Sequence, residues 1–189
     1  MFINPDNQEF KQFIYVPLCH QETPYTCGVA SVQSILEGYG LTYTQDVLSE
    51  MLKQKPLYGT DYRNIISFME MLGFLATFHI EMKIEMIKEL IDNKITPLLM
   101  LQAWKEDDID YCYDWRDSHY VIACGYDDKR IFFMDPWTLG YYTFLTYEAL
   151  VKCWHTLDST GLHFYYPALI IKHEQLPFCY NPNKIKQME

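Results

Sequence analysis

The chain has 189 residues, a length that fits one domain with a sizeable hydrophobic core. Its 25 acidic and 15 basic residues give a formal net charge of −10, which excludes nucleic acid as an expected partner, because phosphates are bound by clustered Lys and Arg. No apolar run approaches the roughly 18 residues of a transmembrane helix. The start, MFINPDNQEF, lacks the basic and apolar regions of a signal peptide. We therefore expect a single domain over residues 1–189 without a membrane span, cytoplasmic or exported by a route that needs no signal peptide.

The early part of the chain is predicted to be largely helical. Apolar residues recur there at helical spacing, and the segments are separated by residues that begin or end helices, such as Thr44, Pro56 and Gly73. The predicted helices cover residues 29–36, 44–52, 61–72 and 84–93, with a strand at 74–80 before the last of them.

The later part of the chain has the patterns of strands. The run TPLLMLQAW is continuously apolar, and HYVIACGYD and IFFMD flank the turn-like DDKR as the arms of a hairpin. Helices first and antiparallel strands later indicate an α+β fold instead of alternating βαβ units. The predicted strands are 96–104, 119–127, 131–135, 140–145 and 164–172, with a short helix at 146–154.

The six cysteines form no CxxC pair and no regular framework. In a chain of this size without a signal peptide, they are interpreted as reduced thiols. A zinc site needs three or four ligands at recognisable spacing, and the sequence offers none. We expect no metal and no cofactor.

Cys27 lies where the loop in CHQETPYTCGVAS becomes an apolar helix. The unpaired N–H groups and the dipole at a helix N-terminus favour a thiolate, the form in which cysteine is a nucleophile. His119 opens an apolar strand after a polar loop, a position from which a rigidly held base can face a cleft. The alternatives are an inert buried thiol and a hydrogen-bonded histidine at a strand end.

Asp135 follows His119 by sixteen residues, across the predicted hairpin. Its carboxylate can accept a hydrogen bond from the imidazole and fix its tautomer. An even turn would place Asp135 opposite Ile122, on the other face of the sheet from His119. A triad therefore predicts an odd-length loop, a β-bulge, or an Asp135 beyond regular pairing. The alternative is that Asp135, before Pro136, only begins a turn.

Gln21 precedes Cys27 by six residues, in a loop that contains Pro24. A side-chain amide there could donate hydrogen bonds, together with the backbone N–H of Cys27, to the oxygen that becomes negative during attack on a carbonyl. Removing one such donor typically lowers a rate by about 10²–10³.

These residues, in this order, resemble a known family. The segments VPLCHQETPYTCGVASVQSILEGYG, SHYVIACGYD and IFFMDPWTLG are similar to the papain-like bacteriocin-processing peptidases, also called double-glycine-leader peptidases. The resemblance implies a papain-like fold, with an N-terminal helical lobe packed on a C-terminal antiparallel sheet. It implies that Cys27 is the nucleophile, His119 the general base and acid, Asp135 the orienting carboxylate and Gln21 the oxyanion donor.

Two departures from the family pattern bear on function. The chain has no membrane-spanning or nucleotide-binding segment, which indicates a stand-alone form instead of one fused to a transporter. Trp137, Thr138 and Leu139 stand where the family has small residues, which bears on substrate preference. The predicted function is a cysteine peptidase that hydrolyses a peptide or isopeptide bond of a peptide or protein. The alternatives are a transglutaminase or deamidase that acts on Gln side chains, and a non-catalytic binding module.

Overall fold

The computed structural model describes residues 10–56, 59–104 and 110–184. Residues 1–9, to which the expectation about a signal peptide applies, lie outside the described residues. Within the described ranges, no helix combines the length and the apolar character needed to cross a membrane.

The observed elements follow the predicted ones closely. The helices of the described residues are α1 (Cys27–Gly38), α2 (Gln45–Met51), α3 (Tyr62–Met71), α4 (Ile84–Asp92) and α5 (Tyr147–Cys153). The strands are β1 (Gln12–Phe13), β2 (Leu75–His79), β3 (Leu98–Gln102), β4 (Ser118–Tyr126), β5 (Arg130–Met134), β6 (Thr143–Thr146), β7 (His155–Leu157), β8 (His163–Tyr165) and β9 (Ala168–Lys172). The prediction of a single strand over residues 164–172 was wrong, because this segment forms two strands, β8 and β9.

One antiparallel sheet forms the centre of the molecule. Six of its strands follow the order β2-β9-β3-β4-β5-β6, and β1 pairs with the far end of β4. Strand β9, the last in sequence of the described strands, lies between β2 and β3 and pairs with both. Strands β7 and β8 pair with each other in a separate hairpin.

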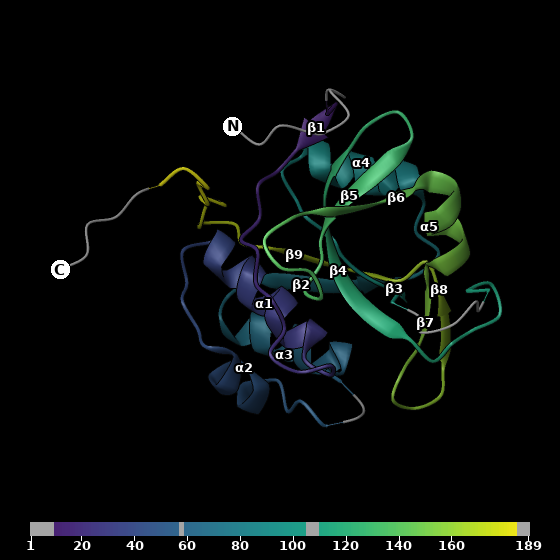
Figure 1. The fold of residues 1–189 in the computed structure, drawn as a ribbon. Helices are drawn as coiled ribbons and strands as arrows, with labels where there is room; N and C mark the ends of the chain where they lie inside the picture. Colours follow the sequence, from purple (N-terminus) through teal and green to yellow (C-terminus); the bar gives the residue numbers. More distant parts are fainter. Residues whose placement is uncertain (1–9, 57–58, 105–109, 185–189) are drawn as a thin grey trace.

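Helices cover both faces of the sheet. Figure 1 shows α1, α2 and α3 gathered on one side of it, with α4 and α5 on the other. Every residue of β3 and of β5 is buried, as expected for strands that are covered on both faces. This is the predicted α+β arrangement, in which an N-terminal group of helices packs against an antiparallel sheet.

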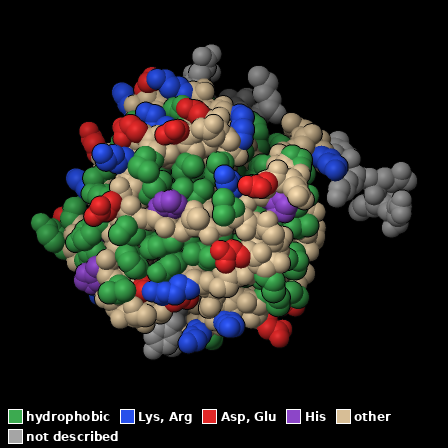
Figure 2. Space-filling model, turned by 180° about the vertical axis from the view of Figure 1, so that it is seen from behind, with side chains coloured by type: hydrophobic (Ala, Val, Ile, Leu, Met, Phe, Trp, Pro, Cys, Tyr) green, Lys and Arg blue, Asp and Glu red, His purple; other side chains and the backbone are tan. Residues whose placement is uncertain are grey.

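The surface mixes apolar and charged side chains. Seen from behind, hydrophobic side chains reach the surface in patches, and acidic and basic side chains are interspersed between them (Figure 2). A single cluster of buried apolar residues beneath the surface includes side chains from all five helices and from β2, β3, β4, β5 and β9.

Candidate active site

Cys27 is the first residue of α1 and is only 7% exposed. Burial opposes ionisation of its thiol. A hydrogen bond with His119, the charge of that imidazole, and the backbone N–H groups of Tyr120 and Gly28 outweigh burial and lower the pKa of the Cys27 thiol. The helix N-terminus adds a favourable dipole at the same place. The local structure therefore favours the thiolate that was expected here.

Other cysteines in the fold show the opposite shift. Burial and the nearby Glu37 carboxylate, which accepts a hydrogen bond from the thiol, raise the pKa of Cys19 to about 12. Burial likewise raises the pKa of Cys124, and it raises that of Cys153 to about 12. These thiols stay protonated near neutral pH, whereas Cys27 is poised to ionise.

His119 and Asp135 form a buried pair. The imidazole Nε2 of His119 lies 2.7 Å from Oδ1 of Asp135, and the residues are 7% and 5% exposed. Burial alone would lower the pKa of His119. Hydrogen bonds with Asp135 and Cys27, together with the charges of both groups, raise that pKa to about 9. Because Nε2 faces Asp135, the other ring nitrogen, Nδ1, is the one left for Cys27.

A β-bulge brings Asp135 to the face of the sheet that His119 occupies. Ile122 pairs with Met134, but the register shifts by one residue between Ala123 and Gly125. Asp135 follows Met134 directly, so the continued register puts it opposite the residue before Ile122, two positions from His119. The predicted irregularity is therefore present, and its effect is to align the carboxylate with the imidazole.

Three donors hold the Asp135 carboxylate. Oδ1 accepts from His119 and also from the backbone N–H of Trp137, at 2.9 Å. Oδ2 accepts from the indole Nε1 of Trp104, at 3.0 Å. Trp104 was not singled out from the sequence, because it lies 31 residues before Asp135 and carries no motif.

Gln21 is buried near this group, but its side chain has local partners. Its Nε2 donates to the carbonyl of Thr23 at 2.8 Å, and its Oε1 is buried with no hydrogen-bond partner among the described residues. The backbone N–H of Gln21 donates to the carbonyl of Pro136 at 2.9 Å. The loop before Cys27 is thus tied to the turn after Asp135, and the oxyanion role of Gln21 stays a prediction.

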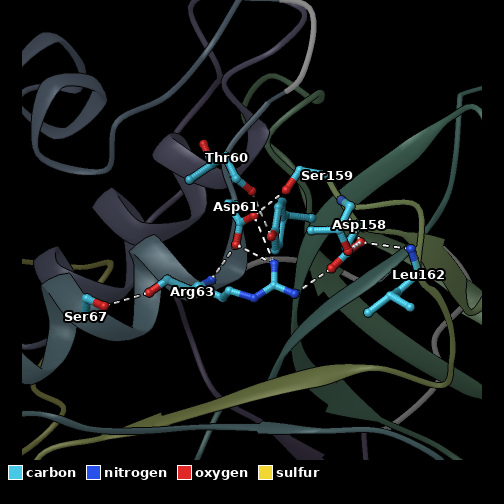
Figure 3. Close-up of polar contacts among 9 residues, drawn as sticks. Thr60, Asp61, Arg63, Ser67, Asp158, Ser159 and Leu162 are labelled. Atoms are coloured by element: carbon cyan, nitrogen blue, oxygen red, sulfur yellow. Dashed lines mark hydrogen bonds and ion pairs between the residues drawn. The ribbon is translucent and has the colours of Figure 1, made fainter.

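A small cavity, with a volume of about 90 Å³, opens beside Cys27 and His119. One wall is built by Asp61 at the start of α3 and by Asp158 and Ser159 in the loop between β7 and β8. Arg63 joins them: its guanidinium lies 2.7 Å from Asp158 Oδ2 and 3.1 Å from Asp61 Oδ2, and Ser159 Oγ donates to Asp61 Oδ2 at 2.6 Å (Figure 3). These hydrogen bonds and ion pairs join the start of α3 to the loop between β7 and β8, segments that are almost a hundred residues apart in the sequence.

The capping of α3 accounts for the position of Asp61 in this wall. Asp61 is the N-cap residue, and its side chain accepts from the backbone N–H of Arg63. The Asp158 contribution was not foreseen, since a loop carboxylate has no sequence signal that names a partner 95 residues away. In the described part of the chain, no group of three or more His, Cys, Asp or Glu could hold a metal ion.

Comparison with known proteins gives one family and a set of similar structures. A family model described as "Peptidase_C39 like family" matches residues 13–162, a span that contains Gln21, Cys27, His119 and Asp135. No curated protein matches the chain significantly.

Several solved structures resemble the fold, including the following three. The peptidase domain of Streptococcus ComA, a bifunctional ABC transporter involved in quorum sensing, is 22% identical, with a TM-score of 0.59 over 85% of this chain and 100% of that one. A double-glycine-motif protease from an AMS/PCAT transporter, in complex with its leader peptide, is 16% identical, with a TM-score of 0.62 over 86% and 95%. A Bacillus anthracis protein assigned as a C39-like peptidase is 15% identical, with a TM-score of 0.63 over 86% and 98%. The chain therefore has the fold of these peptidase domains.

Proposed function

The chain belongs to the Peptidase C39-like family of cysteine peptidases, and from this premise we propose that it hydrolyses peptide bonds through a Cys27–His119–Asp135 triad and an acyl-enzyme intermediate. The observation that carries the proposal is the continuous set of hydrogen bonds from Cys27 through His119 to Asp135. The thiol pKa is lowered and the imidazole pKa is raised, which supports a thiolate–imidazolium pair as the resting form.

The proposed reaction has two steps. The Cys27 thiolate attacks the carbonyl carbon and forms a C–S bond, while the carbonyl oxygen takes the negative charge. The imidazolium of His119 then gives its proton to the leaving amine as the C–N bond breaks. In the second step neutral His119 removes a proton from water, which attacks the thioester and returns the thiolate and a carboxylic acid.

Three further groups assist in the proposed reaction. The Asp135 carboxylate keeps the imidazole in the orientation and tautomer that presents Nδ1 to the sulfur, and it stabilises the imidazolium. The backbone N–H of Cys27 and the second amide hydrogen of Gln21 are the proposed oxyanion donors, since the first amide hydrogen is bonded to Thr23.

We propose a peptide or protein as the substrate. One structural neighbour is described in complex with a leader peptide, which supports an extended peptide as the kind of molecule that reaches such a site. The small cavity beside Cys27 and His119 supports a substrate whose scissile bond lies in that cavity, next to the wall that Asp61, Asp158 and Ser159 build.

A direct test combines thiol labelling with peptide cleavage. Iodoacetamide at pH 6 should alkylate Cys27 much faster than the exposed Cys112 and Cys179, and no other site should label at that rate in Cys27→Ala. A synthetic peptide library, analysed by mass spectrometry, should show new carboxyl and amino termini with wild type and none with Cys27→Ala or His119→Ala.

The alternatives have distinct outcomes. Release of ammonia without chain cleavage would replace the peptidase proposal with deamidation or transglutamination by the same residues. Equal fast labelling of wild type and Cys27→Ala would show that Cys27 is not activated, and the proposed mechanism would fail.

A further inference from the structure

Trp104 reaches the Asp135 carboxylate from the opposite side of β4. Strand β3 pairs with β4 so that Leu101 lies opposite His119, and Trp104 follows two residues after β3 ends. Asp135 follows β5, the strand that pairs with β4 on its other edge. The indole therefore spans the end of the strand that carries His119, and its Nε1–H donates to Asp135 Oδ2 at 3.0 Å.

The backbone at Trp104 is held in an uncommon conformation. Its φ angle is +61°, in the left-handed region that a bulky side chain adopts only when its surroundings impose it. Those surroundings are visible: the N–H of Ala103 donates to the carbonyl of Asp117, and the buried Gln102 accepts from the N–H of Asp117 at 2.9 Å. Gln102 Nε2 also donates to the carbonyl of His155 at 3.0 Å. The turn that aims the indole is thus anchored on two sides.

The indole N–H completes the hydrogen bonding of the carboxylate. Oδ1 has two donors, His119 and the Trp137 backbone, whereas Oδ2 has Trp104 as its donor among the described residues. A carboxylate fixed at one oxygen can still turn about its last bond, and donors at both oxygens fix its plane. Asp135 is 5% exposed and, with Trp104, lines a cavity of about 730 Å³ whose other walls are mostly apolar, so an unpaired Oδ2 would be costly there.

We propose that Trp104 is a positioning residue for the reaction: its indole N–H fixes the ionised Asp135 carboxylate and, through it, the His119 ring. The inference rests on the proposed function, since it assigns Trp104 a role in the same triad. Trp104 is not among the residues that line the small cavity beside Cys27, and in this proposal it acts through its hydrogen bond to Asp135.

Trp137 provides a matched control. Trp137 is 46% exposed as a residue, close to the 48% of Trp104, and the two ring centroids are 6.5 Å apart. Trp137 donates to Asp135 through its backbone N–H, which a side-chain substitution preserves. Trp104→Phe therefore removes a hydrogen bond to the carboxylate, whereas Trp137→Phe removes a similar indole and no such bond.

The first experiment uses the wild-type protein. In ¹⁵N-resolved NMR, the indole N–H of Trp104 should exchange with solvent at least about tenfold more slowly than that of Trp137, because it is hydrogen-bonded despite similar exposure. Equal exchange rates would overturn the inference without any variant having to fold.

The second experiment uses the variants, with folding checked by thermal melting. In Trp104→Phe, the pKa of His119 measured by NMR should fall by about one unit and the rate of Cys27 alkylation by iodoacetamide at pH 6 should fall about tenfold. Trp137→Phe should keep both values near those of wild type. In an Asp135→Asn background, Trp104→Phe should cause no further loss.

The outcomes separate the two proposals. A wild-type Cys27 that alkylates no faster than Cys112 would refute the proposed function. An activated wild-type Cys27 with unchanged values in Trp104→Phe, or with equal losses in Trp137→Phe, would refute only the positioning role.

Discussion

Replacing Asp135 by Asn is the most informative single change, because it keeps the shape of the side chain and removes its charge. Three donors meet the carboxylate, from His119 and Trp137 at Oδ1 and from Trp104 at Oδ2. An amide has one oxygen, so if that oxygen serves His119 and Trp137, its NH₂ group faces the indole N–H of Trp104. Two donors then oppose each other beside the buried side chain of residue 135.

The expected change in the pKa of His119 follows from the hydrogen bonds that are weakened or lost. A hydrogen bond to a charged group contributes about 1.5–3 kcal/mol, against about 0.5–1.5 kcal/mol for a neutral pair, a difference of roughly 1–1.5 kcal/mol. Since 1.36 kcal/mol corresponds to one pKa unit, the pKa of His119 should fall from about 9 by about one unit or more. The unpaired indole adds to this loss.

The sign of the pH effect can be stated for the proposed active form, in which Cys27 is deprotonated and His119 protonated. In wild type this form appears as pH rises through the lowered pKa of Cys27, and it disappears as pH rises through about 9, the pKa of His119. In Asp135→Asn a less basic imidazole stabilises the thiolate less, so the lower limit rises and the upper limit falls. The window of peptide cleavage should narrow from both sides.

The assay needs no known substrate. His119 is titrated by NMR, and alkylation of Cys27 by iodoacetamide is followed by mass spectrometry of its peptide, so that labelling of the exposed Cys112 and Cys179 does not interfere. The reasoning would be refuted if the pKa of His119 in folded Asp135→Asn stayed within about 0.3 unit of the wild-type value.

Three further changes test other parts of the site. Gln21→Ala should lower kcat for a cleaved library peptide by about 10²-fold with little change in KM, and a loss confined to KM would argue against an oxyanion role. Arg63→Met should remove the ion pairs of Arg63 with Asp61 and Asp158 and lower the free energy of unfolding in urea by no more than about 1 kcal/mol, because the Arg63 side chain is 44% exposed. Arg63→Lys should lower that free energy less. An unchanged urea midpoint in both variants would contradict a stabilising contact. Gly28→Ala would bring a new Cβ to 2.8 Å from Cβ of Thr60, so the melting temperature should fall by an amount that corresponds to about 1–3 kcal/mol. A variant as stable as wild type would show that Thr60 moves aside at little energetic cost.

Most of the fold could be predicted because its elements carry clear periodicity. The failure at residues 164–172 has a local cause: Tyr166 adopts a left-handed φ of +53° and Pro167 lacks an N–H, so the chain turns there and its two halves join different sheets. The short strands β1 and β7 have two and three residues, too few to show an alternating pattern.

The candidate site likewise has residues that the sequence could indicate and residues that it could not. The sequence could indicate Cys27, His119 and Asp135, because each lies at the end of a predicted helix or strand, where a polar residue stands out from the apolar pattern. The bulge followed from requiring His119 and Asp135 to share one face. The sequence did not predict the contributions of Trp104 and Arg63, because their hydrogen-bond partners lie 31 and 95 residues away and only the folded chain brings those side chains together.

The place of β9 has a consequence for how the protein matures during synthesis. Residues 168–172 form the last of the described strands to be synthesised, yet they fill the gap between β2 and β3, which are made about seventy to ninety residues earlier. Contacts between such distant segments form late, because a long loop must close first. The growing chain therefore carries all three residues of the proposed triad well before the sheet beneath them is complete. A nascent chain therefore contains the proposed catalytic side chains before the complete sheet is there to align them.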